Sequence, residues 1–221
     1  MYPLIGIIMR SDFSKSGHRI DYTYSDIEVS IIKSGGIPMS ILVTEIDKFI
    51  PICDGFILEG GDNFTKEDFI CLDKIYDANK PLLGICLGMQ EMAYLNGGVI
   101  KEIKGHKNKM HDVIINKDSL LYRIIGKKKI KVNSRHKEAI MKTDAKISAK
   151  STDNIIEAIE DGSRVFYLGL QWHPESMYNE YDDSRKIFDY FIKVCHDNIS
   201  TKEWYHAYRI IWFRNWGING T

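Results

Sequence analysis

The sequence predicts an α/β fold, in which a doubly wound, mixed and mostly parallel sheet is flanked by helices. In the first half of the chain, short apolar runs rich in β-branched residues alternate with amphipathic stretches, which is the pattern of parallel strands covered by helices on both faces. In the second half the apolar runs are shorter and are separated by Asn, Asp and Gly turns, which favours a mixed sheet. The length of 221 residues, with 44% hydrophobic and 27% charged residues, is that of an ordinary globular domain.

The first half of the chain supplies the parallel strands and two helices between them. A helix is expected over residues 22–33, ended by Gly35-Gly36, and a second over residues 66–79, where Thr65 is the candidate N-cap and Pro81 follows the end. The strands are expected at residues 4–9, 37–43, 55–59 and 81–86.

The second half of the chain supplies the remaining strands and a closing helix. The strands are expected at residues 113–115, 129–132, 155–159 and 165–170. The helix is expected from Asp182 to about His196, because carboxylates stand at its start and apolar residues recur at core spacing. Residues 1–200 therefore form the predicted domain.

An aromatic-rich extension, residues 201–221, follows the predicted domain. Its aromatic residues recur every four positions, so on a helix they form one stripe: Trp204, Tyr208, Trp212 and Trp216. Three interpretations stay open for this stripe, namely packing on the domain itself, contact with a second copy in a dimer, and anchoring at a membrane interface.

Composition excludes several classes of protein. Thirty basic and thirty acidic residues give a net charge of zero and a pI near 7.0, which argues against nucleic-acid binding. Because no apolar run reaches the roughly 18 residues that span a bilayer and the start does not read as a signal peptide, we expect a cytoplasmic protein that is not in a membrane. The four cysteines lack CxxC spacing, which disfavours a disulfide framework or a structural zinc site.

The most informative stretch contains a cysteine between two glycines at the junction of a predicted strand and a predicted helix. Gly84 and Gly88 stand two residues before and after Cys86. Small residues on both sides allow the sharp turn that exposes a nucleophile, and the N-terminus of the following helix favours a thiolate. The backbone N–H of Leu87 would face a developing oxyanion. The alternative is that Cys86 is a small buried hydrophobic residue, which we expect of the other three cysteines.

A candidate base follows the predicted strand at residues 165–170. His173 should emerge at the end of this strand, where α/β folds collect their ligands. Glu175, two residues later, can orient the imidazole, so the pair completes a Cys-His-Glu arrangement for nucleophilic catalysis. Of the six other histidines, most are expected to be solvated or hydrogen-bonded surface groups: His18, His106, His111, His136, His196 and His206.

These residues resemble the class I glutamine amidotransferase superfamily, with its flavodoxin-like fold, over about residues 3–196. The superfamily carries its triad on GxCxGxQ and a later WHPE-like element, which correspond here to the segments around Cys86 and His173. The resemblance also implies that the glycine turn after the strand at residues 55–59 completes the oxyanion hole with Leu87. Gly61 is the preferred donor and Gly60 the alternative.

A further element, Asn133-Ser134-Arg135-His136, resembles the NSxH segment of the γ-glutamyl hydrolase branch, peptidase family C26. The resemblance implies that this segment and Gln90 bind the glutamyl part of a substrate, with Gly60 nearby. Asn133 and Gln90 serve alternatively as turn and helix residues only. The order after His136 departs from the usual second His and Gln, so the preferred substrate is expected to differ.

The resemblance implies a γ-glutamyl amide hydrolase that acts on a small molecule through a γ-glutamyl thioester and needs no metal or organic cofactor. A glutaminase subunit that delivers ammonia to a separate synthase is the first alternative. The second alternative is a non-catalytic sensor or binding protein that keeps a cysteine at the corner between the strand and the helix. Whether the chain forms a homodimer or binds a synthase is left open.

Overall fold

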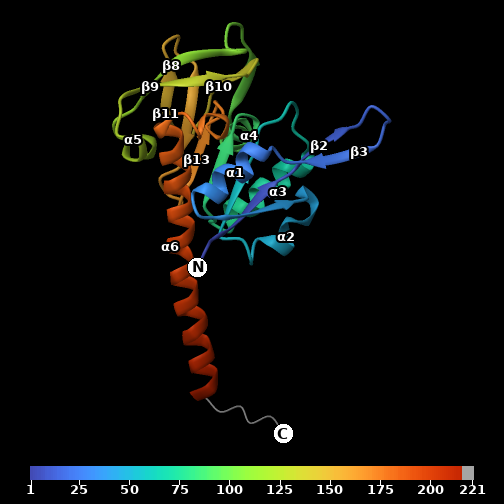
Figure 1. Cartoon of the computed structure of the whole chain (residues 1–221), viewed down its shortest axis with the longest axis vertical. Helices are drawn as coiled ribbons and strands as arrows, with labels where there is room; N and C mark the ends of the chain where they lie inside the picture. The colour runs from blue at the N-terminus through green and yellow to red at the C-terminus, as the bar shows by residue number, and fades with distance from the viewer. Residues whose placement is uncertain (216–221) are drawn as a thin grey trace.

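The computed structural model describes the backbone of residues 1–215 and the side chains of residues 1–199. Its centre is a nine-stranded sheet with the order β4-β1-β5-β6-β13-β12-β11-β8-β9. Figure 1 shows this sheet with helices on both faces and the hairpin of β2 and β3 extending to one side.

The first five strands of this order are parallel and apolar on both faces. Their residues are mostly buried because helices cover both sides, which is why each strand reads as a continuous apolar run. These strands are β4 (Ile37–Ile41), β1 (Leu4–Ile8), β5 (Gly55–Leu58), β6 (Leu82–Ile85) and β13 (Tyr167–Leu170).

The other four strands of the sheet are antiparallel to their neighbours. They are β12 (Ile156–Glu160), β11 (Lys146–Ser151), β8 (Lys109–Ile115) and β9 (Lys129–Ser134). Two small antiparallel sheets accompany them, formed by β7 (Val99–Glu102) with β10 (Glu138–Lys142) and by β2 (Arg10–Phe13) with β3 (Arg19–Tyr22). The sheet is therefore mixed, as predicted.

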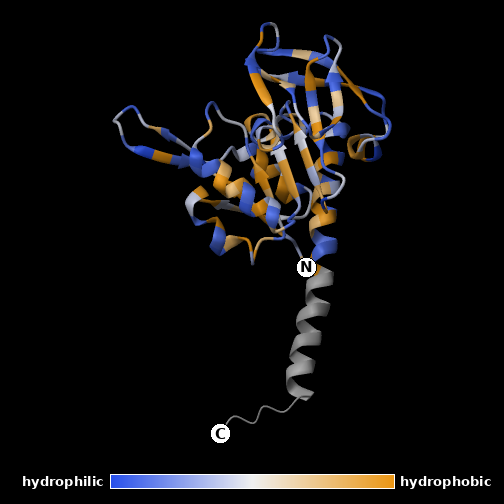
Figure 2. Cartoon of the chain, turned by 180° about the vertical axis from the view of Figure 1, so that it is seen from behind, coloured by the Kyte–Doolittle hydropathy of each residue, from blue (hydrophilic) through white to orange (hydrophobic). Residues whose placement is uncertain are grey.

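Two apolar cores lie on opposite faces of the sheet, because neighbouring residues of the same strand, such as Ile57 and Leu58, belong to different cores. Figure 2 shows that the central strands consist mostly of hydrophobic residues. The first core includes side chains of α1 (Ser25–Lys33), α5 (Leu120–Ile125) and α6 (Asp182–Asn215). The second includes side chains of α2 (Ile46–Phe49), α3 (Lys66–Asp77) and α4 (Leu87–Leu95). Two short 3₁₀ turns complete the described elements, η1 (Val43–Glu45) and η2 (Glu175–Met177). The doubly wound arrangement is confirmed.

The expected elements agree with the structure to within a few residues, but the short helices α2 and α5 were not expected. Thr65 caps α3 as predicted, because its Oγ1 accepts from the Asp68 N–H at 3.2 Å while the Asp68 carboxylate accepts from the Thr65 N–H at 2.7 Å. The hairpin β2–β3 and the strands β7, β10 and β11 were not expected. Helix α6 continues past the predicted end near His196 to Asn215.

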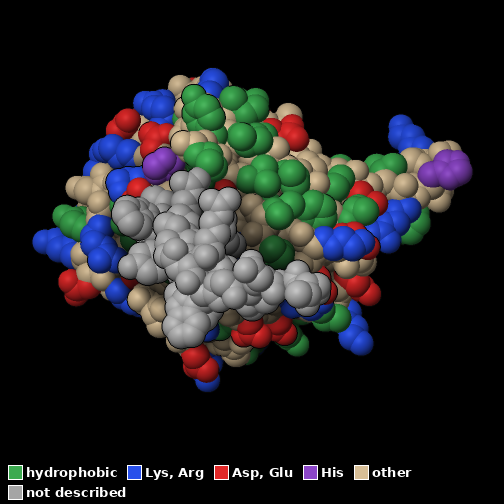
Figure 3. Space-filling model, turned by 90° about the horizontal axis from the view of Figure 1, so that it is seen from below, with side chains coloured by type: hydrophobic (Ala, Val, Ile, Leu, Met, Phe, Trp, Pro, Cys, Tyr) green, Lys and Arg blue, Asp and Glu red, His purple; other side chains and the backbone are tan. Residues whose placement is uncertain are grey.

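The predicted aromatic stripe lies outside the residues whose side chains the structure describes. In the described part of the chain, none of the helices is both long and apolar enough to cross a bilayer. Figure 3 shows acidic and basic side chains interspersed on one face of the molecule, which agrees with the balanced charge of the sequence. The cytoplasmic location stays a prediction.

Candidate active site

Cys86 occupies a sharp corner between strand β6 and helix α4. Its φ of 53° and ψ of −102° are strained values for a residue with a side chain. Its N–H donates to the carbonyl of Leu170 at 2.7 Å, which ties the corner to β13. The side chain is 9% exposed. The strand–turn–helix geometry expected of a nucleophile elbow is therefore present.

The glycines on either side of Cys86 allow helix α4 to pack closely against the sheet. A Cβ on Gly88 would overlap the carbonyl oxygen of Leu58 on β5, and a Cβ on Gly84 would overlap the sulfur of Met92. No larger residue fits at either position without a shift of the helix. The close packing of α4 against the sheet therefore requires glycine at both positions.

His173 lies close to Cys86 because strands β6 and β13 end at the same level, Ile85 opposite Leu170. Its Nδ1 donates to the Glu175 carboxylate at 2.7 Å. Burial lowers the pKa of His173, but hydrogen bonding with Cys86 and the contact with Glu175 outweigh burial and raise the pKa to about 10. The three residues are thus brought together, with the imidazole held between a sulfur and a carboxylate.

The backbone of His173 is fixed by a second side chain, that of Asn133 at the end of β9. The Asn133 Oδ1 accepts from the His173 N–H at 2.8 Å, and its Nδ2 donates to the His173 carbonyl at 3.0 Å. Asn133 therefore holds the residue after β13 from both sides of its peptide. Both polar atoms of the Asn133 side chain are therefore used in contacts with the protein.

A pocket of about 210 Å³ opens beside the sulfur of Cys86. Its lining comes from α1, the turn after β5, the elbow, the segment after β9 and the segment after β13. The lining residues are Tyr24, Asp26, Gly61, Asp62, Cys86, Arg135, His173, Glu175 and Ser176. A neighbouring cavity of about 430 Å³ shares Gly61 and Asp62 with this pocket.

The glycine turn after β5 lies against the candidate nucleophile and base. A Cβ on Gly60 would stand 3.0 Å from the His173 ring and 3.5 Å from the Cys86 Cβ, and a Cβ on Gly61 would stand 2.9 Å from the Leu87 side chain. The backbone of this turn and the start of α4 therefore flank the sulfur. Their role as oxyanion donors stays a prediction.

The predicted substrate-binding residues differ in whether they line the pocket or are buried in the protein. Arg135 is exposed and lines the pocket. Gln90 is 3% exposed, donates to the carbonyl of Glu138 at 3.2 Å and to Gln171 at 3.3 Å, and does not line the pocket. Ser134 is buried and donates to the carbonyl of His106. Of the four residues of the NSxH-like segment, only Arg135 lines the pocket.

Two supporting residues were missed by sequence reasoning. The Gln171 Nε2 donates to the Cys86 Sγ at 3.7 Å, although Gln171 stands only two residues before His173. The Arg10 guanidinium donates to the carbonyl of Glu59, just before the glycine turn, and pairs with buried Glu91 at 2.5 Å. Both residues fix the backbone or side chains around the elbow.

The carboxylate of Glu59 links the glycine turn to the start of helix α1. It accepts from the Tyr24 N–H at 2.9 Å and from the Thr23 hydroxyl at 3.1 Å. Burial raises the pKa of Glu59 to about 7, and these hydrogen bonds oppose that effect. The start of α1, which supplies Tyr24 and Asp26 to the pocket, is thereby attached to the turn that carries Gly60.

Within the described residues, a cluster of four side chains suited to hold a metal ion lies outside this pocket. His106, His111, His136 and Glu157 each offer a ligand atom within 4.8 Å of the others. His106 and His136 are buried and His111 is half-buried, so three of the six other histidines are not surface groups and the expectation that most of them are was wrong. Strand pairing, which sequence spacing does not reveal, brings them together.

Comparisons with known proteins agree with this fold and identify relatives of the chain. The peptidase C26 family model matches residues 65–175, which include the elbow and the segment with His173 and Glu175. The gamma-glutamyl-gamma-aminobutyrate hydrolase of Escherichia coli (strain K12) is 25% identical over 91% of this chain and 96% of its own length. A glutamine-hydrolysing GMP synthase subunit of Methanosphaera stadtmanae is 31% identical over 86% of this chain and 98% of its own length.

Solved structures with low sequence identity share the fold. A putative GMP synthase subunit from Thermoplasma acidophilum superposes with a TM-score of 0.73 at 20% identity, over 92% of this chain and 98% of its own. The glutaminase domain of Trypanosoma brucei CTPS, with bound acivicin, gives a TM-score of 0.65 at 18% identity, over 88% of this chain and 94% of its own. With the elbow geometry and the family match, these findings show that the chain belongs to the peptidase C26 family, within the class I glutamine amidotransferase-like proteins.

Proposed function

We propose that the protein is a cysteine hydrolase that cleaves the γ-glutamyl amide bond of a small molecule through Cys86, His173 and Glu175. This proposal rests mainly on the relative positions of these three side chains. The sulfur of Cys86, on a strained corner with φ of 53°, shares a pocket with His173, whose Nδ1 lies 2.7 Å from the Glu175 carboxylate. Membership of the C26 family supports the reaction class.

In the proposed reaction the Cys86 thiolate attacks the γ-carbonyl carbon and forms a tetrahedral oxyanion. The N–H groups of Gly61 and Leu87 stabilise that oxyanion, with Gly60 as the alternative donor. His173 gives its proton to the leaving nitrogen, so the C–N bond breaks and an amine departs, leaving a γ-glutamyl thioester. Water then loses a proton to His173, attacks the thioester carbonyl and releases glutamate and the Cys86 thiolate.

The pocket supports a glutamyl group as the part of the substrate nearest the sulfur. Its volume of about 210 Å³ is small, and its lining contains both charge signs, Arg135 as well as Asp26 and Asp62. An α-carboxylate pairs with the guanidinium, and an α-ammonium pairs with a carboxylate. The neighbouring cavity of about 430 Å³ offers room for a leaving amine larger than ammonia.

A glutaminase subunit that supplies ammonia to a separate synthase is the second candidate function. The likeness to the GMP synthase subunit of Methanosphaera stadtmanae favours it, because the match extends over 98% of that protein. In this case glutamine is the substrate and a partner synthase is required for full activity. A non-catalytic protein that retains an elbow cysteine is the third candidate.

One experiment separates the three. Glutamate release is measured with purified full-length protein on glutamine and on a panel of γ-glutamyl amines and peptides. Cys86→Ala serves as the blank, and Cys71→Ala, a buried cysteine on α3, serves as the matched control. The hydrolase proposal expects turnover of a γ-glutamyl amine about tenfold or more above glutamine, lost in Cys86→Ala and retained in Cys71→Ala.

The other outcomes would redirect the assignment. Slow turnover of glutamine alone, lost in Cys86→Ala and increased by an added synthase, supports the glutaminase subunit. The absence of any turnover that depends on Cys86 contradicts both enzymatic functions and supports the sensor or binding protein.

A further inference from the structure

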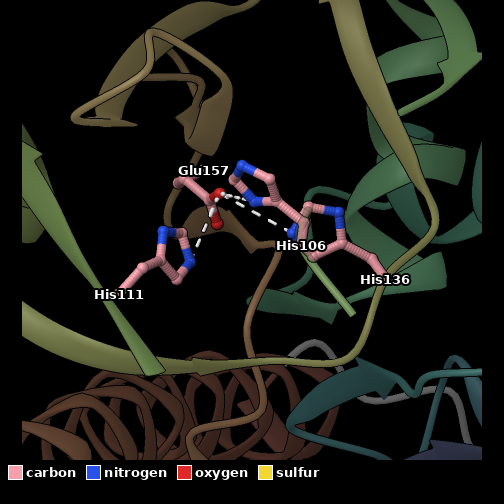
Figure 4. A group of neighbouring side chains, drawn as sticks. All are labelled: His106, His111, His136 and Glu157. Atoms are coloured by element: carbon pink, nitrogen blue, oxygen red, sulfur yellow. Dashed lines mark ion pairs between the residues drawn. The ribbon is translucent and has the colours of Figure 1, made fainter. Parts of the chain in front are cut away.

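A second cluster of chemically active side chains lies outside the pocket, in the antiparallel half of the sheet. His111 belongs to β8, Glu157 to β12, His136 follows β9, and His106 lies in the connection between β7 and β8. Figure 4 shows the three imidazoles arranged around the Glu157 carboxylate. Glu157 is fully buried, and the side chains of His106, His111 and His136 are 1%, 9% and 2% exposed.

The ligand atoms of this cluster lie at distances that suit a tetrahedral metal site. The Glu157 Oε1 is 3.3 Å from the His106 Nδ1 and 3.6 Å from the Nε2 atoms of both His111 and His136. Bonds of about 2.0–2.2 Å from a tetrahedral zinc ion to its ligands place the ligand atoms about 3.3 Å apart. A movement of the side chains by a fraction of an ångström to about one ångström closes the coordination shell, since all four atoms are already within 4.8 Å.

The same atoms have no hydrogen-bond partner. Among the described residues, the buried atoms without a hydrogen bond include the inward nitrogens of all three histidines and both oxygens of Glu157. The histidine nitrogens form ion pairs of 3.3–3.6 Å with the Glu157 Oε1 only where an imidazole is protonated, and a buried polar atom without a hydrogen bond costs about 1–3 kcal/mol. A single cation that accepts the lone pairs of the three nitrogens and of one Glu157 oxygen accounts for four of these five atoms.

The outward nitrogens of two of the histidines are held by the protein. The His106 Nε2 donates to Asp153 at 2.9 Å, and the His136 Nδ1 donates to the carbonyl of Glu138 at 2.8 Å. Hydrogen bonds of this kind fix the tautomer, so that the inward nitrogen presents its lone pair. Metal-binding histidines in proteins usually have such partners.

We propose that His106, His111, His136 and Glu157 bind one divalent transition-metal ion of the zinc class. Three imidazoles and a carboxylate are ligands that zinc accepts, and four protein ligands fill a tetrahedral shell. The site is therefore structural and is separate from the reaction proposed at Cys86. The sequence did not predict it, because the ligands are spread over strands that are distant along the chain.

The ion would connect four segments, of which the one after β9 lines the pocket and β12 contacts the segment before His173. His136 follows Arg135, which lines the pocket, and Asn133 on the same segment holds the backbone of His173. Glu157 is linked to the elbow, because its carbonyl accepts from the N–H of Gln171, whose side chain reaches the Cys86 sulfur. Metal binding thus fixes the wall of the pocket without contact with the substrate.

The test uses full-length protein, freed of metal by dialysis against a chelator and then loaded with Zn²⁺ or Co²⁺. Metal content is measured by mass spectrometry, the affinity for Zn²⁺ by calorimetry, and the coordination geometry by the visible absorption of Co²⁺, which is intense in a tetrahedral site. We expect one ion per chain, a tetrahedral Co²⁺ spectrum and a melting temperature that is higher with Zn²⁺ than without it.

Substitutions of single residues locate the ion. Glu157→Gln and His111→Ala should lose the Co²⁺ spectrum and weaken Zn²⁺ binding by about 100-fold or more, whereas His18→Ala, an exposed histidine in the β2–β3 turn, should bind like the parent. Cys86→Ala should also bind Zn²⁺ like the parent. This control is needed because the pocket contains a thiol, an imidazole and a carboxylate, which are metal ligands themselves. Asp153 is 57% exposed, so Asp153→Asn should fold and weaken Zn²⁺ affinity about 10- to 100-fold even if the ligand variants fail to fold.

Two results would overturn the proposal. The first is a parent protein that retains no stoichiometric Zn²⁺ or Co²⁺, which leaves the cluster as buried histidines around a carboxylate. The second is binding that is lost in Cys86→Ala and kept in Glu157→Gln and Asp153→Asn, which assigns the ion to the pocket.

Discussion

Replacement of Asn133 by alanine removes the side chain that holds the peptide of His173. In the parent, the Asn133 amide accepts from the His173 N–H at 2.8 Å and donates to its carbonyl at 3.0 Å. No neighbouring described side chain makes either contact. We therefore expect the backbone that carries the imidazole to lose its fixed position relative to Cys86.

The size of the effect follows from these two hydrogen bonds. Each contributes about 0.5–1.5 kcal/mol, and a donor left unpaired in a half-buried site costs about 1–3 kcal/mol, so Asn133→Ala should lower the free energy of unfolding by about 1–3 kcal/mol. A displacement of the imidazole by about 1 Å lowers catalysis about 100-fold. We expect kcat to fall about 10- to 100-fold while KM changes less than about threefold.

The assay is steady-state kinetics on the best γ-glutamyl substrate, with unfolding in urea measured on the same samples. Asn116→Ala, the same substitution in the turn after β8, is the matched control and should keep the parental kcat. The reasoning is refuted if KM rises with kcat unchanged, because Asn133 would then bind substrate, as the sequence suggested.

Two further predictions test the electrostatics and the packing of the site. Burial lowers the pKa of His173 and its contacts with Cys86 and Glu175 raise it to about 10, so Glu175→Gln, which removes a negative charge, should lower this pKa. His173 must be protonated to act as the acid, so the alkaline limb of kcat/KM should move to lower pH by about one to three units, and an unmoved limb contradicts the role of Glu175. Gly88→Ala should lower the free energy of unfolding by about 1–3 kcal/mol because the new methyl group meets a β5 carbonyl. Gly162→Ala, where a Cβ meets no atom within 4 Å, is the control, and equal stability of the two variants would refute the packing argument.

The parallel half of the sheet and the elbow could be predicted because their signals are local. Apolar runs predicted β1, β4, β5 and β6, and the glycines around Cys86 predicted the corner before α4. His173 and Glu175 were predictable because they follow an apolar strand whose end meets that of β6. In each case a few neighbouring residues contain the information.

The directions of side chains and the meeting of distant strands could not be predicted. Gln90 and Ser134 belong to motifs that suggest a substrate site, yet packing turns both side chains into the protein. His111 and Glu157 are distant in the sequence and meet because β8 and β12 both pair with β11. The β2–β3 hairpin is polar and largely exposed, so its sequence lacks the repeating apolar residues that predict a strand.

The central claim is that Cys86 forms a γ-glutamyl thioester, and trapping that species tests it most directly. Full-length protein is mixed with the best γ-glutamyl substrate, quenched in acid within milliseconds and digested, and the peptide that contains Cys86 is weighed by mass spectrometry. The account predicts a γ-glutamyl group on Cys86 that appears before glutamate and is absent in Cys86→Ala. Steady turnover with no adduct on Cys86, and with undiminished activity in Cys86→Ala, would contradict it.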